Sequence, residues 1–179
     1  MIELKKAGLP ETVEVDGSLY AIHTSFKYFL RFIELLATKD AKPQDFDFMY
    51  KRQKPQDRES GLLALIQFCN PPQILPRTDK AVDYAIDADY IFAAFMERYG
   101  IDLVENEMHW YKFHALFKGL HDTKLNEIIG YRLWENTSGK RDAYTRQMEK
   151  MRAAWELPPE NGEEDEDLKA FEALLYPQK

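Results

Sequence analysis

Apolar and polar residues alternate near the start of the chain. Residues 12–15 alternate strictly, the pair Asp16-Gly17 favours a tight turn, and residues 18–22 return to an extended pattern. This arrangement predicts a β-hairpin over about residues 12–22.

The next segment, about residues 25–38, is apolar around more than half of a helical circumference. Thr24 or Ser25 can cap its start. Its only polar strip consists of Lys27, Arg31, Glu34 and Thr38. A second apolar face, opposite to that of Phe26, consists of Tyr28, Phe32 and Leu35. Two interpretations remain open at this point: the helix is sandwiched inside the domain, or its second face meets a partner chain.

Further helices are predicted from apolar spacing, capping residues and the prolines and glycines that end helices. They cover about residues 44–51, 57–68, 83–99, 105–118, 123–134, 138–155 and 165–175. We expect Asp83, Asp122 and Ser138 to cap three of them, Gly100 to end one, and 105–118 to be the central core helix. The predicted fold class is therefore mainly α: a single compact helical domain over residues 1–158, with the N-terminal hairpin, and an acidic C-terminal extension over 159–179.

The composition agrees with one ordinary domain. The chain has 179 residues, of which 45% are hydrophobic and 31% are charged. No stretch approaches the roughly 20 apolar residues that a membrane span needs, and the N-terminus lacks the apolar run of a secretory signal. We therefore expect a cytoplasmic protein without a membrane partner.

Negative charge is concentrated at the C-terminus. The formal net charge is -7, and residues 160–179 hold seven acids and two lysines, which leaves -2 for the rest of the chain. Because no basic stripe is evident, we expect no nucleic-acid binding. The acidic run is either a solvated tail or a docking arm for a basic partner.

The sequence offers little for catalysis or for a cofactor. His109 and His114 diverge by about 140° on a helix, and no HExxH or CxxC motif is present. Asp83, Asp87 and Asp89 are explained by a helix start and a solvated flank, and Cys69 by a packed thiol. Since nucleophile and nucleotide-binding motifs are also missing, we expect no enzyme activity, no metal and no cofactor.

Four stretches, in order and spacing, resemble the bacteriophage gene-product-fifteen family. They are residues 83–95, 99–103, 108–113 and 128–132. The most specific piece is the run His109-Trp110-Tyr111-Lys112-Phe113, although family members often carry a second Trp where this chain has Tyr111. The resemblance covers roughly residues 8–158 and leaves out the acidic extension. Such proteins occur in tailed phages and prophages of Gram-positive bacteria.

The resemblance implies a tail-assembly chaperone in the host cytoplasm that binds the tape-measure protein and possibly the tail-tube protein. A structural tail or connector component is the alternative. A chaperone of this kind presents apolar grooves to helical client segments. The candidate protein-binding residues are Tyr28, Phe32, Leu35, Trp110 and Tyr111. An apolar strip left uncovered without client also favours self-association into a homo-oligomer.

Overall fold

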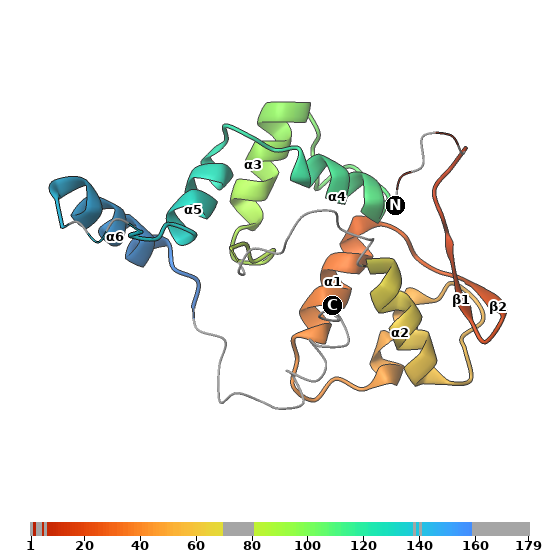
Figure 1. The fold of residues 1–179 in the computed structure, drawn as a ribbon. Coiled ribbons are helices and arrows are strands. Elements are labelled where there is room, and N and C mark those ends of the chain that lie inside the picture. The colour runs from red at the N-terminus through yellow and green to blue at the C-terminus, as the bar shows by residue number, and fades with distance from the viewer. Residues whose placement is uncertain are drawn as a thin grey trace. The chain divides into compact units, whose positions relative to one another are not determined.

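The structure is a computed structural model that describes residues 2, 5, 7–69, 81–137, 139 and 141–158 (Figure 1). The strands are β1 (Thr12–Val15) and β2 (Ser18–Ala21). The helices are α1 (Phe26–Leu36), the 3₁₀ helix η1 (Pro43–Met49), α2 (Arg58–Cys69), α3 (Ala88–Tyr99), α4 (Trp110–Lys118), α5 (Lys124–Arg132) and α6 (Ala143–Trp155). The prediction of a mainly α fold with an N-terminal hairpin is confirmed. The predicted helix at 165–175 lies outside the described residues.

The chain divides into two compact units, where the sequence predicts one helical domain. Of the described residues, the first unit contains those up to Cys69 together with 107–115, and the second contains 81–106 and 116–158. Helix α4 therefore begins in the first unit, and its last turn belongs to the second. The acidic extension 159–179 lies outside the described residues.

The hairpin forms as its turn chemistry predicts. Asp16 and Gly17 have φ values of 50° and 73°, the backbone of a two-residue turn that matches the twist of the two strands. Val13 pairs with Tyr20 and Val15 with Ser18 in antiparallel register. The side chains of the two valines are buried, while their neighbours in β1 are exposed.

Helix α1 is embedded in the first unit along its phenylalanine side. Phe29 has no exposed area and stacks on Phe68 of α2 and on Trp110 of α4, with ring centroids 5.5 and 5.4 Å apart. Phe32 packs edge-on against Phe46 of η1 at 5.2 Å. The interpretation that α1 is sandwiched inside the protein therefore holds for this side of the helix.

Helix α3 begins later than the sequence predicts. The carboxylate of Asp83 accepts hydrogen bonds from the backbone N–H groups of Ala85 and Ile86, at 2.9 and 3.0 Å. It thus organises a separate turn over residues 84–87, and the helix starts at Ala88. Its predicted end is confirmed, because Gly100 is left-handed with φ 64°.

The start of α4 is also displaced, from about residue 105 to Trp110. The Asp102 carboxylate accepts from the N–H groups of Val104 and Glu105, at 2.8 and 3.0 Å, which closes a turn there. Farther on, the N–H of Trp110 donates to the carbonyl of Thr24 at 2.7 Å. That pairing holds the chain extended up to the first helical residue.

Besides Asp83, two more of the predicted helix caps are wrong. Thr123 caps α5, since its side chain accepts from the N–H of Asn126, whereas Asp122 stands outside the helix with φ 53°. Asp142 caps α6 by accepting from the N–H of Thr145, so this helix starts after Ser138, which itself lies outside the described residues. A side chain caps a helix only where the backbone turn brings its oxygen over the first free N–H groups.

The second unit is built around a buried ion pair. Arg132 of α5 donates from Nη1 and Nη2 to the two carboxylate oxygens of Asp87, at 2.7 and 2.9 Å. Its remaining donors reach the carbonyls of Ala81 and Trp155, at 2.8 and 2.7 Å. The side chain of Asp87 is 1% exposed and that of Arg132 8%. One guanidinium therefore ties together the start of the unit, the turn before α3 and the end of α6.

Two helical glycines, Gly61 and Gly130, provide a matched test of how closely other residues pack against α2 and α5. A Cβ at Gly61 of α2 would lie 2.9 Å from Tyr50 Oη and 3.1 Å from Pro55 Cγ, and the Tyr50 hydroxyl donates to the Gly61 carbonyl. At Gly130 of α5 it would meet nothing within 4 Å. We expect Gly61→Ala to lower the free energy of unfolding by about 1–3 kcal/mol through overpacking. Gly130→Ala should raise it by about 0.5–1 kcal/mol through helix propensity.

Urea unfolding of both variants beside the wild type measures the two effects. The prediction fixes the sign of each change in the free energy of unfolding and does not require the two changes to be equal in size. A stabilising Gly61→Ala would contradict the close approach of Tyr50 and Pro55 to α2.

Candidate protein-binding surface

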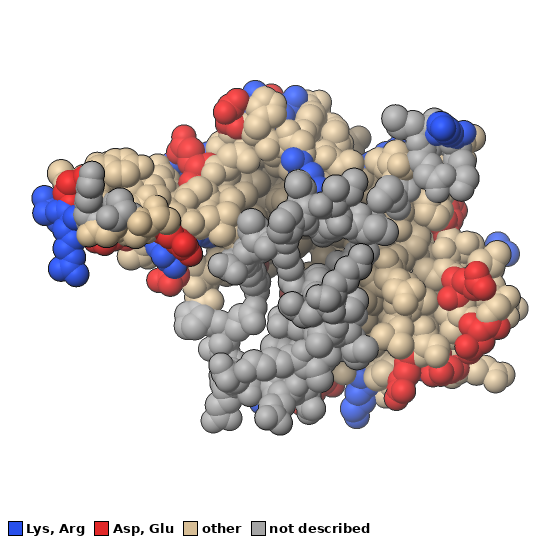
Figure 2. All heavy atoms as spheres, in the orientation of Figure 1, with Lys and Arg blue, Asp and Glu red and all other residues tan. Residues whose placement is uncertain are grey.

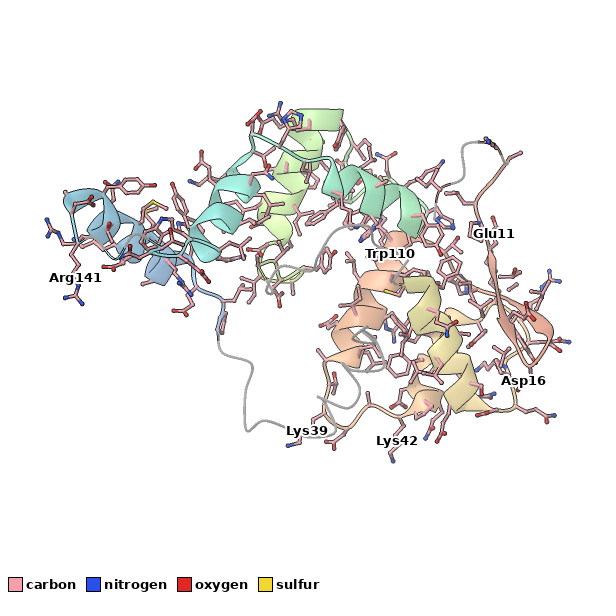
Figure 3. The ribbon with its side chains drawn as sticks, viewed as in Figure 1. Glu11, Asp16, Lys39, Lys42, Trp110 and Arg141 are labelled. Carbon is pink, nitrogen blue, oxygen red and sulfur yellow. The ribbon has the colours of Figure 1, made fainter. Side chains whose placement is uncertain are left out.

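Three of the five residues that the sequence singles out for protein binding lie in the core of the first unit. Phe32 is 0% exposed, Trp110 2% and Tyr111 7%. Trp110, labelled at the start of α4 in Figure 3, donates from its indole Nε1 to the carbonyl of Cys69 at 2.8 Å. Tyr111 stacks on Phe68 at 4.8 Å. Side chains buried to this degree cannot contact a partner in this conformation, and they form the packing under the surface instead.

The other two residues, Tyr28 and Leu35, are half-buried on α1. Tyr28 stacks on the ring of His23 at 4.3 Å with the planes 9° apart, and its other neighbour is Phe48, at 6.3 Å. The guanidinium of Arg31 lies over Phe48, 4.3 Å from the ring centroid. We name this set, His23, Tyr28, Phe48 and Arg31, the Tyr28 ladder.

Backbone pairing brings the Tyr28 ladder together from three segments. The N–H of His23 donates to the carbonyl of Met49 at 2.8 Å, and the N–H of Lys51 donates to that of Ala21 at 2.9 Å. These bonds hold the chain after β2 against the end of η1, which places His23 and Phe48 beside α1. Sequence reasoning finds Tyr28 from the wheel of α1, but it cannot find His23 or Phe48, because their proximity depends on this pairing.

The ladder has the composition of an interaction surface. Tyr and Arg are enriched among binding hot spots because they combine a large apolar face with polar donors. Burial, and then the charge of Lys51, lower the pKa of His23, so at neutral pH its ring acts as an aromatic surface. Tyr28, Arg31 and Leu35, spaced three and four residues apart, lie on one face of α1.

A second histidine, His109, caps α4 with its ring. Nδ1 accepts from the backbone N–H of Tyr111 at 3.0 Å, and Nε2 lies 2.9 Å from the carbonyl of Pro10. These two partners require a neutral ring with its proton on Nε2. Burial is the largest cause that lowers the pKa of His109, while the Pro10 bond and Glu11 oppose it.

The capping role of His109 predicts a pH dependence. Because its pKa in the folded protein is below the ordinary 6.5, the stabilisation is fully present above pH 6.5 and is lost as the pH falls through the lowered pKa. Protonation removes the acceptor for Tyr111 and places a positive charge at a helix N-terminus. We expect His109→Asn, whose amide oxygen still accepts from that N–H, to lose this part of the pH dependence.

The measurement is the free energy of unfolding from urea titrations between pH 5 and 8, taken as wild type minus His109→Asn. The difference cancels the contribution of His23, whose lowered pKa acts with the same sign. A difference that does not change with pH would show that the ring does not cap α4.

Other candidate chemistry is weak in the part of the chain that the structure describes. Cys69 is buried, and burial raises its pKa to about 12, so its thiol is inert. No group of three or more His, Cys, Asp or Glu side chains among the described residues could hold a metal ion. On the face shown in Figure 2, the described Lys and Arg residues form separate groups rather than a stripe.

None of the described helices combines the length and the apolar character needed to cross a membrane. No curated protein and no solved structure matches the chain. Residues 70–157 match the model of the family described as bacteriophage Gp15 protein, a segment that contains the buried pair of Asp87 and Arg132 and all of α3 to α6. The match supports a phage Gp15-family protein.

Proposed function

We propose that this chain, as a phage Gp15-family protein, is a non-enzymatic tail-assembly chaperone that binds the tape-measure protein in the cytoplasm of a Gram-positive host. In this role it covers apolar helical segments of its client until tail-tube subunits replace it. The family match over residues 70–157 supports the phage origin, and the Tyr28 ladder is the observation that carries the binding mode.

The Tyr28 ladder suits a helical client because its two α1 residues, Tyr28 and Arg31, lie with Leu35 along one face of that helix. An amphipathic helix inserts side chains at spacings of three and four residues, and Tyr28, Arg31 and Leu35 repeat that spacing on α1. The described surface also carries exposed large apolar side chains elsewhere, which could add contacts along an extended client. They include Leu19, Leu63, Ile86, Met96 and Val104.

Co-expression with the tape-measure protein of the same phage tests the proposal. We expect a soluble complex that forms only when this chain is present, recovered by affinity purification. Tyr28→Ala should reduce the yield of complex, and Tyr144→Ala, which removes an exposed tyrosine of the second unit, is the matched control.

Purified phage particles separate this proposal from its alternative, a structural tail or connector component. A chaperone is missing from finished particles, whereas a structural component is present at a fixed copy number. No complex in cells, together with a fixed copy number in particles, would overturn the chaperone proposal in favour of the structural one.

A further inference from the structure

The guanidinium of Arg31 is not paired with the carboxylate of any described residue. It is exposed, and its Cζ lies 4.3 Å from the centroid of Phe48. Within the described ranges no hydrogen bond or ion pair reaches its side chain, although Glu34 stands three residues farther along the same helix. The five N–H donors of this guanidinium are therefore available.

The charges around Arg31 do not neutralise it. The acid next to Phe48 in the chain, Asp47, is already engaged by Lys54 at 3.1 Å and by Arg58 at 2.9 Å. On the other side of the ladder, the charge of Lys51 acts on His23. Among the described residues, the ladder thus combines aromatic surface with a positive charge that has no carboxylate partner.

Stacking on Phe48 also prepares Arg31 for binding. A guanidinium held against a ring loses less side-chain freedom when it forms hydrogen bonds, and its planar fork matches a carboxylate with two parallel N–H···O bonds. Aromatic contact leaves the edge of the fork free for such a partner.

We infer that the client segment bound at the Tyr28 ladder is a helix that carries an Asp or Glu between apolar residues, and that its carboxylate pairs with Arg31. This inference rests on the proposed function and specifies the chemistry of the client. On α1, Arg31 lies between Tyr28 and Leu35, so the matching helix needs the acid flanked by apolar residues three or four positions away.

The test uses the full chain and a synthetic peptide of the tape-measure segment that this chain protects from protease. Calorimetric titration gives the dissociation constant for the wild type and for Arg31→Gln. We expect the substitution to weaken binding about 10- to 100-fold, the range for losing hydrogen bonds to a charged group. Arg31→Lys, which keeps the charge but loses the fork, should fall in between.

Two controls separate this pairing from general electrostatics. Arg141→Gln removes the same charge from an exposed arginine of the second unit and should leave the affinity unchanged. In the peptide, changing the predicted acid to its amide should weaken binding to the wild type and have little further effect on Arg31→Gln. Additive losses in that double-mutant cycle would overturn the pairing.

The outcomes also distinguish this inference from the proposed function. If Arg31→Gln binds the peptide as tightly as the wild type, the client still binds but the carboxylate pairing is refuted. If the wild type binds no tape-measure segment, the proposed function fails, and the assignment of the carboxylate fails with it.

One more variant tests a competing occupant, the acids of this chain's own C-terminal segment. Changing the seven acids of residues 160–172 to their amides should leave client affinity unchanged. If Arg31→Gln no longer weakens client binding once these acids are amides, Arg31 pairs with the chain's own acids, and the inference is overturned.

Discussion

Replacing Arg132 with Met is expected to remove about 3–5 kcal/mol from the free energy of unfolding, the largest electrostatic effect that we predict for this chain. The substitution leaves the carboxylate of Asp87, which is 1% exposed, without its countercharge. It also removes the donors to the carbonyls of Ala81 and Trp155. A buried charge without a partner costs far more than the pair itself contributes.

Urea unfolding followed by circular dichroism measures this loss. Arg141→Met, the same substitution at an exposed position, should change the free energy of unfolding by no more than about 0.5 kcal/mol. The double variant Asp87→Asn with Arg132→Met removes both charges and should be more stable than Arg132→Met alone. A cost below about 1 kcal/mol for Arg132→Met would show that this ion pair is dispensable.

Replacing Phe32 with Ala is expected to cost about 3–5 kcal/mol, because a fully buried ring is removed from the core of the first unit. The ring packs against Phe29 at 5.9 Å and Phe46 at 5.2 Å, and both neighbours lose their contact surface. Tyr28→Ala, on the half-buried side of the same helix, should cost clearly less. Thermal and urea unfolding of the two single variants provide the comparison.

The difference in burial between Phe32 and Tyr28 decides how client binding at α1 should be tested. A variant that changes Tyr28, Phe32 and Leu35 together would lose stability through Phe32, so a loss of client binding could not be assigned to the surface. Substitutions at Tyr28 and Arg31 avoid this, since neither side chain is fully buried. If Phe32→Ala proved as stable as Tyr28→Ala, the assignment of Phe32 to the core would be wrong.

The candidate surface was only partly predictable from the sequence. The helical wheel of residues 25–38 identifies a second apolar face, and Tyr28 and Leu35 lie on it as half-buried residues. The same wheel includes Phe32, because periodicity records which residues share a face and not how deeply each is covered. Protein binding by these residues remains a prediction.

The partners of Tyr28 could not be inferred in the same way. His23 precedes α1 and Phe48 belongs to η1, and they meet Tyr28 because two backbone hydrogen bonds hold the chain after β2 against the end of η1. Pairing between short irregular segments leaves little trace in residue composition. The role of His109 as a ring cap was hidden for a similar reason, since it also requires the carbonyl of Pro10.

By itself, the sequence determined those features whose causes are local. Asp16-Gly17 specifies the hairpin turn, because both residues adopt positive φ, and Gly100 ends α3 for the same reason. The spacing of apolar residues determined the mainly α class and, within the described residues, which segments between the hairpin and Trp155 are helical. These signals act over a few residues, so no distant partner is needed to produce them.

Tertiary structure alone decided which groups meet across the chain. Asp87 and Arg132 are 45 residues apart, and only the packing of the second unit brings the carboxylate and the guanidinium within 2.7 Å. In the first unit, tertiary structure also moved the start of α4 to Trp110, because the pairing of the Trp110 N–H with the carbonyl of Thr24 competes with an earlier helical turn. Burial divided the aromatic residues into core and surface, since the free energy of a ring depends on what covers it and not on its place in a periodic pattern.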